Sequence, residues 1–266
     1  PEARVILGSS GSEAVEAALK TAVLATGKPG ILAFEGGYHG LTLGALATTY
    51  REDFRGPFLS RIYQGARFAP FPSAGENWER GVARSLETVH WILREGDRKD
   101  EVGAVIIEPI QGRAGVRVPP PGFLHDLAQM TREAGALLIF DEIFTGLGRT
   151  GHLFALMEEQ VVPDLLCLGK GLGGGLPLSA CLGSPSVMNG WPPSRGEAIH
   201  TSTFLGNPLA CAAGLAFLAE LTGGGLVERS RVLGEKLLAD LRRALEGIPE
   251  VAEVRGRGLF LGIELQ

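Results

Sequence analysis

Short apolar runs alternate along this chain with segments of helical periodicity. The runs are rich in leucine and β-branched residues and carry no polar alternation, which predicts strands covered on both faces. We expect strands at Val5–Leu7, Ile31–Phe34, Val102–Glu108, Leu137–Asp141, Leu165–Leu168 and Leu178–Leu182, and helices at Ser12–Thr26, Trp78–Arg94, Gly122–Ala134 and Pro208–Leu221. A parallel sheet with crossover helices requires this order, so the sequence predicts an α/β fold with a mostly parallel sheet.

The C-terminal part of the chain predicts the beginning of a second domain. Three consecutive glycines, Gly223 to Gly225, break the helical pattern and mark a domain boundary. A long amphipathic helix, Leu226–Leu245, and two short strands, Val251–Val254 and Leu259–Leu265, follow. We therefore expect a large domain over residues 1–222 and part of a small α+β domain over residues 226–266. Because so few residues follow the boundary, we expect the sequence to be a portion of a longer protein.

Composition excludes several classes of partner. The 266 residues include 25 Lys and Arg against 30 Asp and Glu, and the basic residues are scattered. Neither nucleic acid nor an anionic membrane is therefore an expected partner, and no uncharged stretch is uninterrupted enough to span a bilayer. The three cysteines, Cys167, Cys181 and Cys211, form no CxxC pair, so we expect no disulfide or zinc site and a reducing cytoplasmic location.

Two charged residues end buried strands and suggest chemistry. Lys170 follows the run Leu165–Leu168, and Asp141 ends the run Leu137–Asp141. In a parallel sheet these groups meet at the carboxyl edge, where open α/β sheets bind ligands. A partly desolvated lysine can form a Schiff base, and a carboxylate can pair with the ring nitrogen of pyridoxal phosphate. On position alone, a lysine that snorkels out at a strand end is the favoured interpretation of Lys170. For the pair, a structural ion pair or a helix cap explains the residues as well as a cofactor site does.

A small-residue segment between the first strand and the first helix is the third element of interest. It reads Gly8-Ser9-Ser10-Gly11-Ser12-Glu13, and Ser10 with Glu13 fits a capping box. An ordinary helix start explains that box. The density of glycine and serine favours a phosphate held by backbone N–H groups at the helix N-terminus.

Other catalytic classes lack their motifs. The two G-x-G-x-x-G matches, at 146–151 and 169–174, do not plainly run into a helix, so nucleotide binding is only a secondary interpretation. Lys170 is followed by glycine, which excludes a P-loop, and the five histidines show no zinc-protease spacing. Tyr38, in Gly36-Gly37-Tyr38-His39-Gly40, either stacks on a planar cofactor or is a partly buried turn residue.

Together these motifs resemble the class III pyridoxal-phosphate aminotransferases, which include ornithine, acetylornithine and 4-aminobutyrate aminotransferases. The resemblance runs in order from Gly8 to the end of the chain. It implies the aspartate-aminotransferase-like fold, fold type I among pyridoxal-phosphate enzymes. The matching segments are Gly11-Ser12-Glu13-Ala14, Gly36-Gly37-Tyr38-His39-Gly40, Glu108-Pro109-Ile110-Gln111-Gly112, Asp141-Glu142-Ile143, Thr145-Gly146-Leu147-Gly148-Arg149-Thr150-Gly151, Gly169-Lys170 and the eight residues from Thr201 to Pro208.

The resemblance implies transfer of an amino group from an amino acid or ω-amine donor to a keto acid acceptor. Lys170 would carry the cofactor and move the proton as general base and acid. Asp141 would pair with the pyridinium nitrogen. Gly11 and Ser12 would bind the phosphate.

The remaining implied roles concern the cofactor ring and a second subunit. Tyr38 and Ile143 would cover the two ring faces, and Glu108 would lie near the ring hydroxyl. His39 would lie close to the site without an assigned role. Thr203 would reach the cofactor phosphate of the neighbouring subunit, which implies a homodimer.

Two positions depart from the family pattern. Phe144 stands where several ω-amino-acid members have a glutamine, and Arg113 stands where ornithine and 4-aminobutyrate enzymes have a glutamate. Arg113 binds either a substrate carboxylate or a surface partner. A racemase, an epimerase or a decarboxylating relative would use the same lysine and aspartate, and a truncated chain that only binds cofactor is a further alternative.

Overall fold

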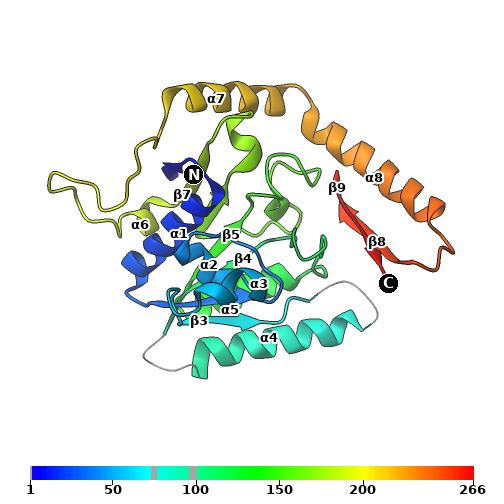
Figure 1. Ribbon diagram of the computed structural model, residues 1–266, viewed down its shortest axis with the longest axis horizontal. Coiled ribbons are helices and arrows are strands. Elements are labelled where there is room, and N and C mark those ends of the chain that lie inside the picture. The colour runs from blue at the N-terminus through cyan, green and yellow to red at the C-terminus, as the bar shows by residue number, and fades with distance from the viewer. Residues whose placement is uncertain (1, 73–76, 96–100) are drawn as a thin grey trace.

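A seven-stranded sheet forms the centre of the protein in a computed structural model that describes residues 2–72, 77–95 and 101–266 (Figure 1). The strand order is β1-β7-β6-β5-β4-β2-β3. Strands β3, β2, β4, β5 and β6 pair in parallel, whereas β7 is antiparallel to both β6 and β1. The expected mostly parallel sheet is therefore confirmed. Its strands are β1 (Arg4–Gly8), β2 (Gly30–Phe34), β3 (Ala66–Ala69), β4 (Val102–Ile107), β5 (Leu137–Asp141), β6 (Leu165–Leu168) and β7 (Ser179–Gly183).

One strand, β3, was not expected from the sequence. It has four residues, Ala66–Ala69, of which Arg67 interrupts the apolar run. It lies at the edge of the sheet and pairs only with β2, so it needs no apolar residues on both faces. The other expected strands are present: β5 and β6 have the predicted ends, and the rest differ from prediction by at most three residues at either end. The strand expected to reach Glu108 ends at Ile107.

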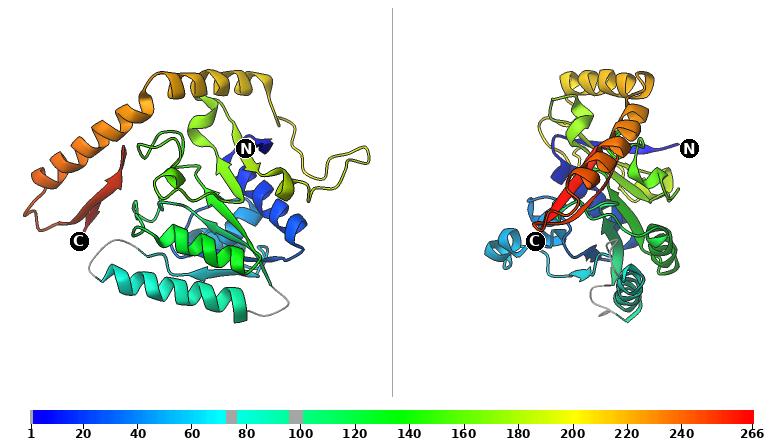
Figure 2. Two further views of the ribbon diagram at one scale, coloured as in Figure 1. Left: turned by 180° about the vertical axis from the view of Figure 1, so that it is seen from behind. Right: turned by 90° about the vertical axis from the view of Figure 1, so that its right-hand side faces the viewer.

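Helices cover both faces of the sheet, because side chains alternate along each strand. Ile106 packs in a core cluster with the alanine-rich face of α1, whereas its neighbours Val105 and Ile107 pack with α4 and α5. In the right-hand view of Figure 2, the light-blue helices α2 and α3 lie on one side of the sheet and the green helix α5 lies on the other. The helices of this part are α1 (Gly11–Thr26), α2 (Leu43–Thr48), α3 (Glu52–Arg55), α4 (Trp78–Glu95), α5 (Phe123–Glu133) and α6 (Pro185–Met188).

The C-terminal part consists of two successive helices and a hairpin. Helix α7 (Pro208–Gly223) ends at the glycine run, and α8 (Leu226–Ala244) begins after Gly225, whose φ is +66°. The hairpin of β8 (Val251–Arg257) and β9 (Phe260–Leu265) packs against α8 (Figure 1). Among the described residues, no single helix has the length and hydropathy to cross a membrane. Only α7 and α8 taken together, which meet at a 63° bend, meet those two criteria.

The hairpin is attached to two loops of the large sheet. The guanidinium of Arg255 donates to the carbonyl oxygen of Gly115 at 2.7 Å and 3.0 Å and to that of Val116 at 3.1 Å. The ring of Phe260 lies edge-on to that of Phe144, with centroids 4.7 Å apart. These contacts fix the loops that follow β4 and β5 from outside the sheet.

A substitution in the aromatic cluster that Phe123 of α5 forms with the sheet tests the packing of this core. Phe123 is 1% exposed and meets Phe34 and Phe71 edge-on, with centroids 6.0 Å and 6.3 Å away. We expect Phe123→Ala to lower the free energy of unfolding by about 3–5 kcal/mol, because it leaves a cavity between helix and sheet. The control Phe58→Ala, at a side chain that is 49% exposed, should cost less than about 1 kcal/mol. Urea unfolding followed by circular dichroism measures both, and equal losses would contradict this assignment of the core.

Candidate active site

A cavity of about 340 Å³ lies at the carboxyl edge of the sheet. Each of five strand ends brings a residue to it: Gly11 follows β1, Tyr38 follows β2, Glu108 follows β4, Asp141 ends β5 and Lys170 follows β6. The cavity therefore lies where parallel sheets of this kind bind ligands. The described residues that line it are Gly11, Ser12, Tyr38, His39, Gly40, Glu108, Arg113, Asp141, Ile143, Phe144 and Lys170.

All but one of the residues that the resemblance assigns to the cofactor site line this cavity. The exception is Thr203, which is exposed in the segment between α6 and α7. Gly40 also lines the cavity, and no role was expected for it from the sequence. Its φ is +129°, and a Cβ at this position would lie 2.2 Å from Oγ of Ser12, so the lack of a side chain leaves room for Ser12. The sequence signal for Gly40 is its place directly after Tyr38 and His39.

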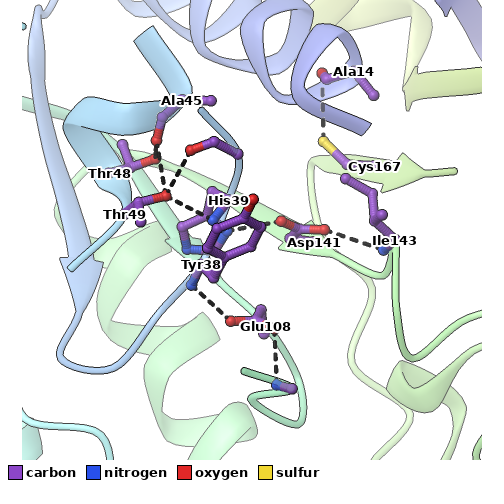
Figure 3. Close-up of polar contacts among 12 residues, drawn as sticks. Ala14, Tyr38, His39, Ala45, Thr48, Thr49, Glu108, Asp141, Ile143 and Cys167 are labelled. Carbon is purple, nitrogen blue, oxygen red and sulfur yellow. Dashed lines mark hydrogen bonds and ion pairs between the residues drawn. The ribbon is translucent and has the colours of Figure 1, made fainter. Parts of the chain in front are cut away.

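Asp141 lines the cavity, and both of its carboxylate oxygens are hydrogen-bonded (Figure 3). Its side chain is 3% exposed; Oδ2 lies 2.8 Å from Nδ1 of His39, and Oδ1 accepts the N–H of Ile143 at 3.1 Å. An ionised carboxylate only accepts hydrogen bonds, so Nδ1 of His39 carries the proton of this contact. The backbone N–H of His39 donates to Oγ1 of Thr49 at 2.9 Å, which fixes the histidine in turn.

Glu108 joins two of the loops around the cavity (Figure 3). Oε1 accepts the N–H of Tyr38 and Oε2 the N–H of Gly112, each at 2.9 Å. Burial raises the pKa of this carboxyl group to about 7, and the charge of Asp141 adds to the increase. The His39 side chain and the two N–H donors act in the opposite direction. At neutral pH the group is therefore close to half-protonated.

Lys170 enters the cavity from a strained backbone position. Its φ of +44° lies in the left-handed region, which is rare for residues other than glycine. Nζ lies 4.2 Å from the centre of the Phe144 ring. Burial lowers the pKa of the amine, as does Arg113, whereas Asp141 and Glu108 raise it. Desolvation of this kind favours the neutral, nucleophilic form of a lysine.

The N-terminus of α1 presents backbone donors to the same cavity. The capping box is present: Oγ of Ser10 accepts the N–H of Glu13, and the Glu13 carboxylate accepts the N–H of Ser10, both at 3.3 Å. The N–H groups of Gly11 and Ser12 belong to the first turn and have no intrahelical acceptor. A Cβ at Gly11 would lie 2.9 Å from Cδ1 of Ile143, so the Ile143 side chain would have to shift to admit a larger residue there.

Arg113 and Phe144, the two departures from the family pattern, both line the cavity. The guanidinium carbon of Arg113 lies 4.5 Å from the centre of the Tyr38 ring and 5.4 Å from that of Phe54. Phe144 lies between Lys170 and Phe260. Phe54, on α3, is an aromatic contact that no sequence motif indicated.

Comparison with known proteins identifies the family. The family model described as aminotransferase class III matches residues 1–266. The acetylornithine aminotransferase of Methanopyrus kandleri is 41% identical over 98% of this chain and 61% of its own length. That of Methanosarcina acetivorans is 39% identical over 99% of this chain and 60% of its own length. The chain therefore belongs to the class III aminotransferase family and spans about three fifths of the length of these curated relatives.

Solved structures give the same result. An (S)-enantioselective omega-transaminase from Thermomicrobium roseum has a TM-score of 0.89 and 35% identity, covering 98% of this chain and 60% of its own. The ornithine aminotransferase from Toxoplasma gondii has a TM-score of 0.86 and 35% identity, covering 99% of this chain and 60% of its own. The fold is thus that of the fold type I transaminases.

The raised pKa of Glu108 makes stability depend on pH. The folded protein keeps this proton up to about pH 7, whereas the unfolded chain loses it near pH 4.5. Between these values the folded state binds more protons, so the free energy of unfolding falls as the pH rises. We expect the wild type to lose about 3 kcal/mol relative to Glu108→Gln between pH 4.5 and pH 7. Urea unfolding at a series of pH values measures this difference, and a difference independent of pH would contradict the assignment.

Proposed function

We propose that the protein transfers an amino group from an amino acid or amine donor to a keto acid acceptor, with pyridoxal phosphate as its cofactor. The observation that carries this proposal is the cavity itself, in which a partly desolvated amine, Lys170, and a doubly held carboxylate, Asp141, line the same space. Membership of the class III family supports it, as do the names of the relatives described above, which are three aminotransferases and one omega-transaminase.

The residues around the cavity fit the chemistry of this cofactor. An aldehyde needs an amine, a ring nitrogen needs an anionic partner, and a phosphate needs hydrogen-bond donors. Lys170 offers the amine and Asp141 the anion. Gly11 and Ser12 offer first-turn N–H groups at a helix end that favours negative charge. A ring and a branched aliphatic side chain, Tyr38 and Ile143, offer flat and apolar contacts for a planar ring.

When bound, the cofactor supplies an electron sink for a proton transfer at the amine-bearing carbon of the substrate. Lys170 is the group that moves this proton. Its neutral Nζ would take the proton from the substrate carbon as general base and then deliver it to C4′ of the cofactor as general acid. Burial lowers the pKa of the amine, which increases the fraction of it in the neutral form.

Asp141 would hold the ring nitrogen of the bound cofactor in its protonated form, because the negative charge of a side chain that is 3% exposed is little screened by solvent. His39 is a positioning residue in this scheme: its Nδ1–H fixes Oδ2 and the rotation of the carboxylate. Glu108 holds the Tyr38 loop against the Gly112 turn and lies on the side that we assign to the ring hydroxyl.

Replacement of Lys170 tests the mechanism. We expect Lys170→Ala to lower turnover by about 10⁴-fold or more, because both the covalent attachment and the proton transfer are lost. Borohydride reduction followed by peptide mass spectrometry should find the mass of the cofactor on Lys170 in the wild type. The matched control is Lys236→Ala, at an exposed lysine on α8, which should retain full turnover. Full turnover of Lys170→Ala would rule out this mechanism. Loss of substrate chirality without amine transfer would instead indicate a racemase.

We further propose a homodimer, with a large domain over residues 1–222 and part of a small domain over residues 226–266. Thr203 lies outside the cavity of its own chain, and its neighbour Phe204 and the nearby Leu209 are 66% and 69% exposed, as expected for residues that meet another subunit. We also propose a reducing cytoplasmic location, on the ground that the three cysteines form no CxxC pair in the sequence.

The role of Thr203 predicts weaker cofactor binding when it is truncated. We expect Thr203→Ala in the full-length protein to raise the dissociation constant of the cofactor about tenfold, because one hydrogen bond to a charged group is lost. Fluorescence titration measures the constant, and light scattering measures the mass. The control is Thr222→Ala, at an exposed threonine on α7 that bonds its own helix. Unchanged cofactor affinity would exclude the role of Thr203, and a monomeric mass would exclude the dimer.

A further inference from the structure

Arg113 is a cation at the cavity without an anionic partner in the described part of the chain. Its side chain is exposed and lines the cavity that also holds Lys170. Its contacts are with two aromatic rings, those of Tyr38 at 4.5 Å and Phe54 at 5.4 Å. No described carboxylate lies within ion-pair distance of it, and no described acceptor takes one of its hydrogen bonds. Its five N–H donors are therefore available to a ligand.

The carboxylates of the cavity are committed to other donors. Both oxygens of Glu108 accept backbone N–H groups, and both oxygens of Asp141 are held by His39 and Ile143. Burial also raises the pKa of Glu108 to about 7, so its negative charge is only partly developed at neutral pH. Neither group neutralises the guanidinium.

We propose that Arg113 binds the carboxylate of the substrate and so selects amino acids and keto acids over amines and aldehydes that lack a carboxylate. This inference rests on the proposed function. A guanidinium offers two parallel N–H donors that match the two oxygens of a carboxylate. The Tyr38 and Phe54 rings hold the guanidinium in place before the ligand arrives, which reduces the side-chain entropy that binding would otherwise cost.

The position of Arg113 would orient the substrate in the cavity. Tyr38 contacts the guanidinium and is itself tied to Glu108, while Lys170 lies against Phe144. A substrate whose carboxylate is held by Arg113, in the loop after β4, thus meets the amine of Lys170, which comes from the segment after β6. The charged end of the substrate and its reacting carbon are recognised by separate side chains, Arg113 and Lys170.

Matched pairs of substrates test the proposal in the full-length protein loaded with cofactor. Alanine and pyruvate carry the carboxylate, and ethylamine and acetaldehyde are their counterparts without it. We expect Arg113→Gln to lower kcat/KM for alanine and pyruvate by about tenfold to a hundredfold, mainly through KM, because charge-assisted hydrogen bonds are lost. Because Arg113 also lowers the pKa of Lys170, the same variant should lower kcat/KM for ethylamine and acetaldehyde as well, but by a clearly smaller factor than for alanine and pyruvate. Arg113→Lys should fall between Arg113→Gln and the wild type, since it keeps the charge and loses the paired donors.

A binding measurement separates this inference from the proposed function. Propionate carries a carboxylate but neither an amine nor a carbonyl group, and propionamide is its neutral counterpart. Calorimetry should show that propionate binds the wild type more tightly than Arg113→Gln, again by about tenfold or more, and that propionamide does not distinguish them. The control is Arg243→Gln, at an arginine that is 78% exposed on α8, and it should bind propionate as the wild type does.

The outcomes are distinct. Equal losses for substrates with and without a carboxylate would overturn the proposal, because they would show that Arg113 supports the loop rather than the ligand. Unchanged propionate binding in Arg113→Gln would overturn it as well. If the wild type transfers no amine between any of these substrates but binds propionate through Arg113, the proposed function fails and the carboxylate site remains.

Discussion

The buried carboxylate of Asp141 is the group around which the cavity is organised. A charge at this depth is stable only if hydrogen bonds replace its lost water, and the chain supplies them from two directions. The N–H of Ile143 comes from the same loop, whereas Nδ1 of His39 comes from a residue 102 positions earlier in the chain. The loop after β2 is therefore tied to the end of β5 by the electrostatic requirement of one side chain, and Tyr38 is carried into the cavity with it.

Much of the scaffold could be predicted from the sequence, because it depends on local patterns. The capping box of Ser10 and Glu13 marks the start of α1, and the uninterrupted apolar runs of β4 and β5 mark strands covered on both faces. The positions of Lys170 and Asp141 after such runs were enough to predict that they share an edge, since parallel strands end on the same side. Their proximity is a consequence of chain direction and needs no knowledge of side-chain packing.

The contacts between loops could not be predicted in this way. The pairing of His39 with Asp141 depends on the order β5-β4-β2, which no local pattern specifies. The edge strand β3 could not be predicted from an apolar run, because a strand at the edge of a sheet needs fewer apolar residues. The resemblance places Glu108 near the cofactor ring, but that its two oxygens join the loops of Tyr38 and Gly112 follows only from the folded structure. The same holds for Arg113, whose contacts with the rings of Tyr38 and Phe54 no sequence pattern indicated.

The contact between Phe260 and Phe144 has a consequence for how such chains diverge. The ring of Phe144 touches a C-terminal hairpin on one side and the amine of Lys170 on the other. Gly112 leaves no spare room, since a Cβ there would lie 2.4 Å from the Phe144 ring. A change of side-chain size at position 144 must therefore be compensated at position 260 or 112 for the lysine to keep its place. Among homologues, positions 112, 144 and 260 should therefore covary, so that changes in the hairpin are accompanied by changes in the residues that line the cavity.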